Sequence, residues 1–283
     1  MKIKYESKYY PEKLRNIKNP PKEINVCGNV DILNDFGIAI IGSRSCSSYG
    51  EKMTKLFVQK ICEYNINIIS GMAIGIDKYA HLETIKQDGI TIAVLPSGIN
   101  RIYPSENKYI VDKIIDSGGA IISEYCDDFV ATSKSFIERN RIVSGISNGV
   151  LIVEGGYRSG TAVTARIAKE QKRKIFCVPS SLDNPKGLVP NKLIHEGEIL
   201  VRDENDILKE FDNIFIKKTK KNLNQKEKEK LPIYYLLDDE MDINEIVKIS
   251  GLKIEDINYQ LMMLELNNEI EELPGKIYRR VKV

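Results

Sequence analysis

The chain has 283 residues, of which 42% are hydrophobic and 29% charged, a composition that suits a globular protein with one large and one small domain. It contains no apolar run long enough to span a bilayer, and its first residues lack the apolar core of a signal peptide, so we expect a cytoplasmic protein without membrane contact. The five cysteines are scattered and form no Cys-x-x-Cys pair, which argues against a zinc site or a disulfide framework.

Basic charge is concentrated in one short segment. Residues 217–230 contain seven lysines and two glutamates, a net charge of +5, whereas the whole chain carries +2 and the remainder therefore carries −3. Binding to nucleic acid would then depend on a local basic patch and not on a globally basic surface. The low hydrophobicity of this stretch is typical of a linker, which we place at 215–230.

Residues 1–37 show no regular pattern, and we expect an irregular segment that wraps the main domain. From residue 38 onward, short apolar runs alternate with segments of helical period. The predicted strands are 38–41, 66–69, 91–95, 120–123, 149–153 and 174–178. The predicted helices are 51–64, a helix that carries His81 and has Asp77 as its N-cap, 105–116, 136–147 and 162–171, and short elements at 191–196, 199–201 and 204–211 close the domain. This alternation predicts a doubly wound α/β domain over 38–214, built on a parallel sheet.

Residues 231–283 read as a second domain of the winged-helix type. Three helices are predicted at 233–237, 242–250 and 254–266, followed by a hairpin of 269–273 and 276–281. The helix at 254–266 has three acidic and no basic side chains, with a core-facing stripe of Ile254, Ile257, Leu261 and Leu264. Only the wing is basic, through Lys276, Arg279, Arg280 and Lys282. We therefore expect a protein-contact module or a weak DNA accessory, not a sequence reader.

Small and polar residues follow three of the predicted strands. They are Gly42-Ser43-Arg44, Ser70-Gly71, and the turn from Glu154 to Thr161 that includes Ser159 and Gly160. The carboxyl ends of parallel strands meet at one edge of a sheet, where glycine amides, hydroxyls and helix N-termini favour anions. A phosphate-binding pocket is predicted there, although Gly42 could merely permit a turn and Arg44 could be solvated. Neither Gly-x-Gly-x-x-Gly after the first strand nor a Walker motif is present.

A second cluster lies at 134–141, where Lys134, Phe136, Arg139, Asn140 and Arg141 combine three cations with an aromatic ring. Cations for phosphates and a ring for a base are what single-stranded nucleic acid requires. Arg139 and Arg141 are two residues apart and cannot share a helix face, so we expect at least one in the pocket and allow the other a structural role. The plainer alternative has Phe136 stapling the helix start and both arginines solvated.

Other ionisable residues invite a catalytic interpretation that we do not favour. His81 lies four residues after Asp77 on the same helix face, but no nucleophile is coupled to it in the sequence, so capping and packing are the better explanation. Glu124 and Glu154 end neighbouring strands, and we expect them to bind backbone N–H groups or nearby arginines. No catalytic residue, metal or cofactor is therefore predicted.

With these residues in view, the chain resembles the bacterial DNA-processing protein family DprA, also called Smf. The resemblance covers roughly residues 8–210 and rests on ordered motifs: Ile41-Gly42-Ser43-Arg44, Ser70-Gly71-x-Ala73-x-Gly75-Ile76-Asp77, Tyr103-Pro104, Phe136-x-x-Arg139-Asn140-Arg141 and Arg158-Ser159-Gly160. It implies an extended Rossmann-like fold that binds single-stranded DNA, forms a homodimer and helps load the RecA recombinase in natural transformation. Carried over by position, the pocket would be lined by Arg44, Lys134, Phe136, Arg139 and Arg141.

The alternative is a nucleotide-binding enzyme. Phosphoribohydrolases of the same broad fold carry Pro-Gly-Gly-x-Gly-Thr-x-x-Glu, and the comparable turn here is 155–161. Three residues after Thr161 stands Thr164, so the carboxylate that would stabilise an oxocarbenium-like transition state is missing from that position. We therefore expect binding without catalysis. A protein-interaction adaptor with a vestigial pocket is the third possibility.

Overall fold

The computed structural model describes residues 1–211, 215, 233, 237, 240–250, 252, 254–266 and 270–281. The chain divides into two compact units, Met1–Lys218 and Thr219–Val283, and each is described by itself. Within the described residues, no helix is both long and apolar enough to cross a membrane.

The first unit is built on a sheet of nine strands in the order β1-β2-β6-β5-β4-β3-β7-β8-β9. The strands are β1 (Lys2–Lys4), β2 (Glu23–Gly28), β3 (Gly37–Ile41), β4 (Asn67–Ser70), β5 (Thr91–Val94), β6 (Ala120–Ser123), β7 (Gly149–Ile152), β8 (Lys174–Cys177) and β9 (Ile199–Leu200). All pairs from β6 to β9 are parallel, whereas β2 pairs antiparallel with β6, and β1 with β2. The predicted doubly wound, mostly parallel sheet is confirmed. Its strand order reverses between β3 and β7, which is where ligands bind in such folds.

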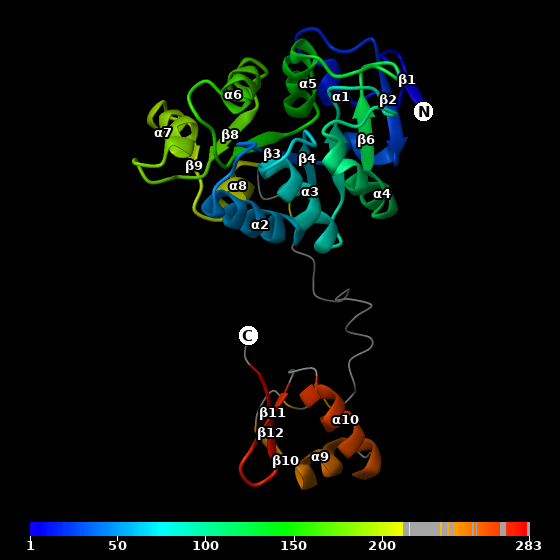
Figure 1. Ribbon diagram of the computed structural model, residues 1–283, viewed down its shortest axis with the longest axis vertical. Coiled ribbons are helices and arrows are strands. Elements are labelled where there is room, and N and C mark those ends of the chain that lie inside the picture. The colour runs from blue at the N-terminus through cyan, green and yellow to red at the C-terminus, as the bar shows by residue number, and fades with distance from the viewer. Residues whose placement is uncertain are drawn as a thin grey trace. The chain divides into compact units, whose positions relative to one another are not determined.

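Helices cover both faces of this sheet (Figure 1). One face packs against α1 (Glu12–Arg15), α5 (Ser133–Gly145), α6 (Gly160–Glu170) and α7 (Leu188–His195). The other packs against α2 (Ser48–Cys62), α3 (Ile76–Lys86), α4 (Lys108–Asp116) and α8 (Asn205–Leu208). Short 3-10 turns complete the unit: η1 (Asp31–Asn34), η2 (Ser105–Asn107), η3 (Pro185–Gly187) and η4 (Lys209–Phe211). The central strands are buried on both sides, as their unbroken apolar runs predict.

The N-terminal 37 residues are not irregular, contrary to expectation. They contain β1, β2, α1 and η1, and they extend the sheet beyond β6. Val26 of β2 pairs with Ile122 of β6, and both Ile24 and Val26 are buried. Leu14 of α1 is fully buried in the same core. These elements are too short to show a clear period, so their regularity depends on tertiary contacts and not on local sequence.

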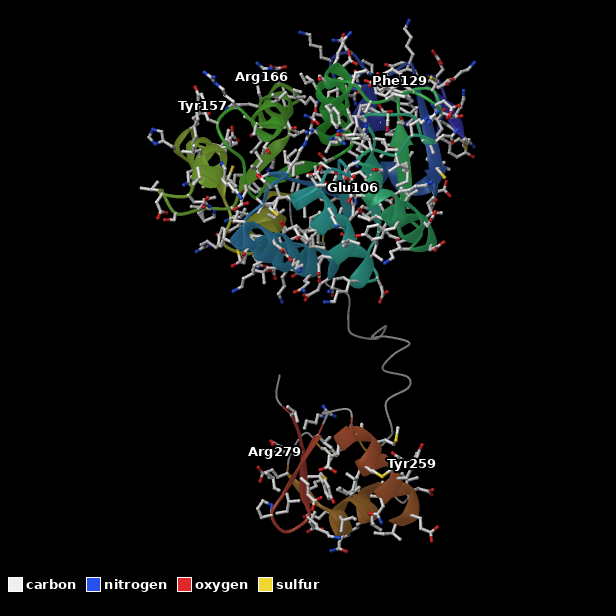
Figure 2. The ribbon with its side chains drawn as sticks, viewed as in Figure 1. Glu106, Phe129, Tyr157, Arg166, Tyr259 and Arg279 are labelled. Carbon is white, nitrogen blue, oxygen red and sulfur yellow. The ribbon has the colours of Figure 1, made fainter. Side chains whose placement is uncertain are left out.

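The second unit contains α9 (Ile243–Ser250), α10 (Ile254–Leu266) and a sheet of three antiparallel strands, β10 (Met241–Asp242), β12 (Ile277–Arg280) and β11 (Ile270–Leu273). The hairpin is confirmed, and β10 is a third strand that the sequence did not predict. Ile257, Leu261 and Leu264 form the core as expected, but Ile254 is 48% exposed because it occupies the first helical position. Tyr259 and Arg279 lie on the surface of this unit (Figure 2). Residues 216–230 of the predicted linker at 215–230, residues 234–236 of the predicted helix, and Lys282 lie outside the described residues.

Candidate functional site

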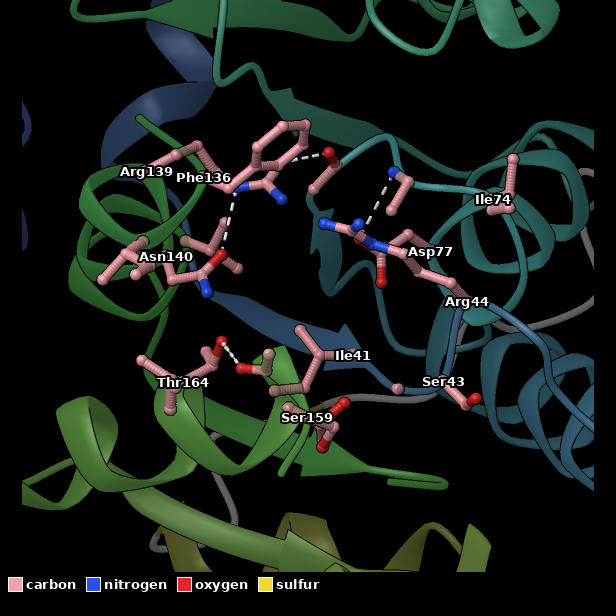
Figure 3. Close-up of a pocket in the computed structure, with 18 of the residues that line it drawn as sticks. Ile41, Ser43, Arg44, Ile74, Asp77, Phe136, Arg139, Asn140, Ser159 and Thr164 are labelled. Carbon is pink, nitrogen blue, oxygen red and sulfur yellow. Dashed lines mark hydrogen bonds between the residues drawn. The ribbon is translucent and has the colours of Figure 1, made fainter. Parts of the chain in front are cut away.

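A pocket of about 460 Å³ opens at the point where the strand order reverses. Its walls come from three strand-end segments and one helix: Ile41–Ser45 after β3, residues 71–77 after β4, residues 159–164 at the start of α6, and Phe136–Val143 of α5. Figure 3 shows these segments facing one another. The predicted convergence of the three strand ends is therefore confirmed for Gly42-Ser43-Arg44, for Gly71 and for residues 159–161 of the third turn, whereas Ser70 and Glu154 do not line the pocket.

The backbone of the Ser43–Arg44 loop is fixed by Gly75. The amide of Ile76 donates to the Ser43 carbonyl at 3.2 Å, and Gly75 has a φ of +80°. A Cβ at Gly75 would lie 2.3 Å from the Ser43 oxygen and 2.5 Å from the Arg44 oxygen. Only glycine allows this close approach, which is the physical reason for a glycine at this position.

Arg44 is the exposed cation of the pocket. Its guanidinium lies 4.8 Å from the centroid of the Phe136 ring, and within the described part of the chain it forms no ion pair. A guanidinium resting on an aromatic face keeps its outward donors available for an anion. Figure 3 shows the Arg44 side chain extending from the loop after β3 toward Phe136 of α5.

Arg139 also lines the pocket, but it is only 4% exposed. Its guanidinium donates to the carbonyl oxygens of Gly71 and, at 2.6 Å, of Val94, at the carboxyl ends of β4 and β5. Burial lowers the pKa of Arg139 to about 10, and the nearby Asp77 carboxylate opposes that shift, so the group stays charged at neutral pH. Burial in turn raises the pKa of Asp77, against the attraction of Arg139. Arg139 therefore supports the pocket floor from inside.

The expectation that Asp77 caps α3 is wrong. The helix begins at Ile76 with Gly75 as its N-cap, and Asp77 lies in the first turn. Its carboxylate accepts the Ala73 amide at 3.4 Å and faces the pocket, where it is the only carboxylate among the described lining residues. Gly75 occupies the N-cap position because the close approach to the Ser43 carbonyl requires a positive φ and leaves no room for a Cβ.

α5 begins one turn earlier than the helical pattern indicated. Thr132 accepts the Ser135 amide and the Ser135 hydroxyl accepts the Thr132 amide, a reciprocal capping box that starts the helix at Ser133. Phe136, Arg139, Asn140 and Val143 then repeat at helical spacing and all line the pocket. The amide oxygen of Asn140 accepts Nε of Arg139 at 3.2 Å.

Three candidate residues are not brought into the pocket. Lys134 has a side chain that is 83% exposed, lies 3.4 Å from the Glu138 carboxylate, and is directed away because it is two residues before Phe136. Arg141 donates to Glu124 at 2.8 Å, which satisfies the expectation that one of the two arginines is structural. Ser70 is fully buried, and its hydroxyl donates to the Ile40 carbonyl at 2.7 Å behind the pocket wall.

The expected supporting roles of two other residues are confirmed. Glu154 accepts the amide of Ser47 at 2.9 Å and its hydroxyl as well, so its carboxylate holds the start of α2. His81 is buried and its Nδ1 lies 2.7 Å from Thr91 Oγ1. Burial lowers the pKa of His81 to about 3, so the ring is neutral at physiological pH. Neither residue lines the pocket.

Sequence reasoning missed Tyr103 as a neighbour of the pocket. Its ring packs edge-on against Phe136, with the centroids 5.4 Å apart, and the residue is 51% exposed. Nothing in the sequence links a tyrosine before a proline to a helix thirty residues later. Ser159, by contrast, caps α6 by accepting the Ala162 amide at 3.3 Å, as the small-residue turn indicated.

The fold and the pocket define a class: a Rossmann-like α/β protein with a cationic pocket at the sheet's switch point, followed by a small helical unit with a β-hairpin. Residues 2–212 match the family model described as DNA recombination-mediator protein A, and residues 218–276 match the DprA winged helix domain. The chain belongs to the DprA family of DNA-processing proteins, and its C-terminal unit is a winged-helix domain.

Relatives and solved structures agree with this assignment. Protein Smf of Escherichia coli strain K12 is 34% identical over 292 residues, covering 98% of this chain and 76% of that protein. DNA processing protein DprA of Bacillus subtilis strain 168 is 36% identical over 210 residues, covering 74% and 70%. The structure of DprA from Streptococcus pneumoniae superposes with a TM-score of 0.71 at 34% identity, covering 75% of this chain and 74% of that one. The structure of DNA processing protein A from Helicobacter pylori, described by its single-stranded DNA binding mode, superposes with a TM-score of 0.67 at 26% identity. The match covers 76% of this chain and 100% of that one.

Proposed function

We propose that this chain binds single-stranded DNA in the pocket at the switch point, without strong sequence preference. The observation that carries the proposal is the exposed Arg44 guanidinium stacked on Phe136, 4.8 Å from the ring centroid. A cation for the phosphate and a ring for the base, side by side, are the elements that hold single strands. Other lining residues are proposed to contact the sugar-phosphate backbone of the DNA: Gly42, Ser43, Gly71, Asn140, Ser159, Gly160 and Thr161. The Helicobacter pylori relative, which binds single-stranded DNA, supports the proposal.

The test is substitution of Arg44 by alanine, with binding to a fluorescent oligothymidine measured by anisotropy across a salt series. Each phosphate contact on a single strand contributes about 0.7 to the slope of log affinity against log salt, so the variant should bind more weakly and with a slope smaller by about that amount. Lys86→Gln, at the far end of α3, is the control for loss of one surface charge. Unchanged affinity and slope in the Arg44 variant would remove this residue from the interface.

We further propose that the bound strand is handed to the RecA recombinase, that the protein acts as a cytoplasmic homodimer, and that its role is in natural transformation or recombination. Family membership supports these assignments. Full-length protein should elute in light scattering with twice the monomer mass at micromolar concentration. RecA filament formation on coated DNA should be faster with the protein than without it. A strict monomer would contradict the dimer, and no acceleration would contradict the handover.

Catalysis is not part of the proposal. Thr164, at the position that carries glutamate in phosphoribohydrolases, donates its hydroxyl to the Gly160 carbonyl at 3.0 Å. The lining carboxylate of Asp77 lies beside Arg139 and accepts the Ala73 amide. Incubation with nucleoside monophosphates, followed by chromatography, should release no free base, and steady turnover would favour the enzyme instead.

A further inference from the structure

We propose that a strand leaving the pocket passes over Tyr103 and makes a second set of contacts with Lys78, Tyr109 and Lys113. These three residues are called the α3–α4 site. The inference rests on the proposed function, because it lengthens the same binding path. It assigns to this chain a contact zone outside the pocket, for the sugar-phosphate backbone and one base of single-stranded DNA.

Ring contacts extend from the pocket as far as Tyr103, which precedes Tyr109 by six residues in the chain. Arg44 stacks on Phe136, and Phe136 meets the exposed ring of Tyr103 at 5.4 Å between centroids. The segment after Tyr103 enters η2 and α4. There, Asn107 donates to the Met72 carbonyl at 2.8 Å, next to the pocket-lining Gly71. The start of α4 is therefore anchored to the pocket wall.

The α3–α4 site combines one ring with two ammonium groups. Tyr109 lies in the first turn of α4 and is 44% exposed. Nζ of Lys78 lies 5.8 Å and Nζ of Lys113 5.5 Å from the centroid of its ring. Lys78 directly follows the pocket-lining Asp77, and α3 packs beside α4 (Figure 1).

Among the described residues, neither Lys78 nor Lys113 forms an ion pair. By contrast, Lys55, which also lies near a tyrosine ring, is bound to Glu51 at 2.6 Å. An ammonium group that is already paired with a carboxylate would gain little free energy from binding a phosphate. Lys78 and Lys113 form no such pair among the described residues, so each can bind a phosphate of the strand and release its counterions. The site thus repeats the chemistry of Arg44 and Phe136, a ring beside cations, on two helices whose N-terminal ends adjoin the pocket wall.

The test compares short and long oligothymidines on the full-length protein. A strand of about 5 nucleotides is near the lower end of single-strand site sizes and serves as the probe of the pocket, whereas one of about 15 extends well beyond it. Tyr109→Ala should weaken binding of the long strand about tenfold and that of the short strand by less than about twofold. Tyr109→Phe, which keeps the ring, should behave as the wild type. The double variant Lys78→Gln/Lys113→Gln should lower the salt slope by about 1.4 for the long strand only.

Matched controls separate this inference from the proposed function. Lys8 lies over the ring of Tyr9 at 5.0 Å in the same manner but away from the pocket-lining segments, so Tyr9→Ala should leave both affinities unchanged. Arg44→Ala should weaken both strand lengths. If Arg44→Ala acts and Tyr109→Ala does not, the α3–α4 site is refuted and the pocket stands. If Tyr109→Ala weakens both lengths equally, the extension is also refuted. If Arg44→Ala changes neither, Arg44 is not part of the interface, and the proposed function loses the contact that carries it.

Discussion

At the scale of single residues, Gly75 connects the fold to the site. Because its Cβ would meet the Ser43 and Arg44 carbonyls, Gly75→Ala must either displace that loop or strain the backbone. We expect a loss of about 1–3 kcal/mol in the free energy of unfolding, measured with urea, and weaker binding of oligothymidine. Gly156→Ala is the control, since its Cβ would meet only the Pro185 oxygen at 3.8 Å and its φ is not positive. Equal effects of the two substitutions would contradict the argument.

Arg44 and Arg139 line the same pocket, but substituting them should affect different properties. Loss of Arg139 should lower stability, whereas loss of Arg44 should lower the affinity for DNA. Arg139→Met leaves Asp77 as a buried charge without its partner and removes the donors to Gly71 and Val94, so we expect a loss of about 3–5 kcal/mol in stability. Arg44→Met removes an exposed charge and should change stability by less than about 0.5 kcal/mol. The affinity for oligothymidine should nevertheless fall in the Arg44 variant. Urea unfolding and anisotropy on both proteins decide the point, and a destabilised Arg44 variant would count against it.

His81 makes stability depend on pH. Thr91 donates its one hydroxyl proton to the Ile68 carbonyl at 2.8 Å, so it must accept from Nδ1–H of His81, while burial keeps the ring neutral by lowering its pKa. The pKa of His81 in the folded protein, about 3, lies below the ordinary value of 6.5. Between these two pH values His81 is therefore protonated in the unfolded chain and neutral in the folded chain. This contribution to stability is complete above pH 6.5 and is lost as pH falls toward 3, by up to about 1.4 kcal/mol per pH unit.

The measurement is thermal unfolding of the wild type and His81→Asn across that pH range. The asparagine amide can still donate to Thr91 but does not titrate. The difference in stability between the two proteins should therefore shrink as the pH falls from 6.5 toward 3. The opposing contribution of Asp77 is common to both and cancels. A difference that is constant with pH would show that His81 is protonated or exposed in the folded protein.

At the scale of elements, α5 shows what the sequence could predict. Phe136, Arg139, Asn140 and Val143 follow the i, i+3, i+4, i+7 pattern of one helix face, and all line the pocket. The same rule places Lys134 and Arg141 on other faces, so helical spacing alone could have excluded them. The expectation that Glu124 binds a backbone N–H group or a nearby arginine is confirmed by its pair with Arg141, but helical spacing could not single out Arg141, because Glu124 is 17 residues away and follows β6. The β1–β2 extension was missed for the same reason: short strands depend on distant partners.

The two charged residues on these other faces provide a prediction about α5. Arg141 and Glu124 have side chains only 19% and 17% exposed, so Arg141→Ala leaves a mostly buried carboxylate without its partner and should cost about 1.5–3 kcal/mol in stability. Lys134 and Glu138 form an exposed pair, so Lys134→Ala should cost less than about 0.5 kcal/mol. Chemical unfolding of both variants provides the comparison. A similar loss from both would show that the ion pair with Glu124 adds nothing to the helix.

At the scale of the whole molecule, the question is what the winged-helix domain adds to binding. Its α10 contains Glu255, Asp256 and Glu265 and no basic residue, so phosphates would be repelled from it. The wing is less basic than its sequence indicates, because Arg279 donates to Glu271 at 2.6 Å and to Glu240 at 2.9 Å. This domain therefore lacks the electrostatic surface of a helix that reads a major groove.

We accordingly expect that deleting residues 231–283 leaves the affinity for single-stranded DNA within about threefold, or about 0.7 kcal/mol. Deleting residues 215–283 also removes the seven lysines of 217–230, and binding should then weaken further, mainly at low salt, where their charge is least screened. Anisotropy with single-stranded and duplex oligonucleotides at two salt concentrations distinguishes these contributions. A large loss on the first deletion that persists at high salt would mean that the winged helix contacts the DNA through shape and hydrogen bonds, because charge cannot account for a loss that salt does not screen.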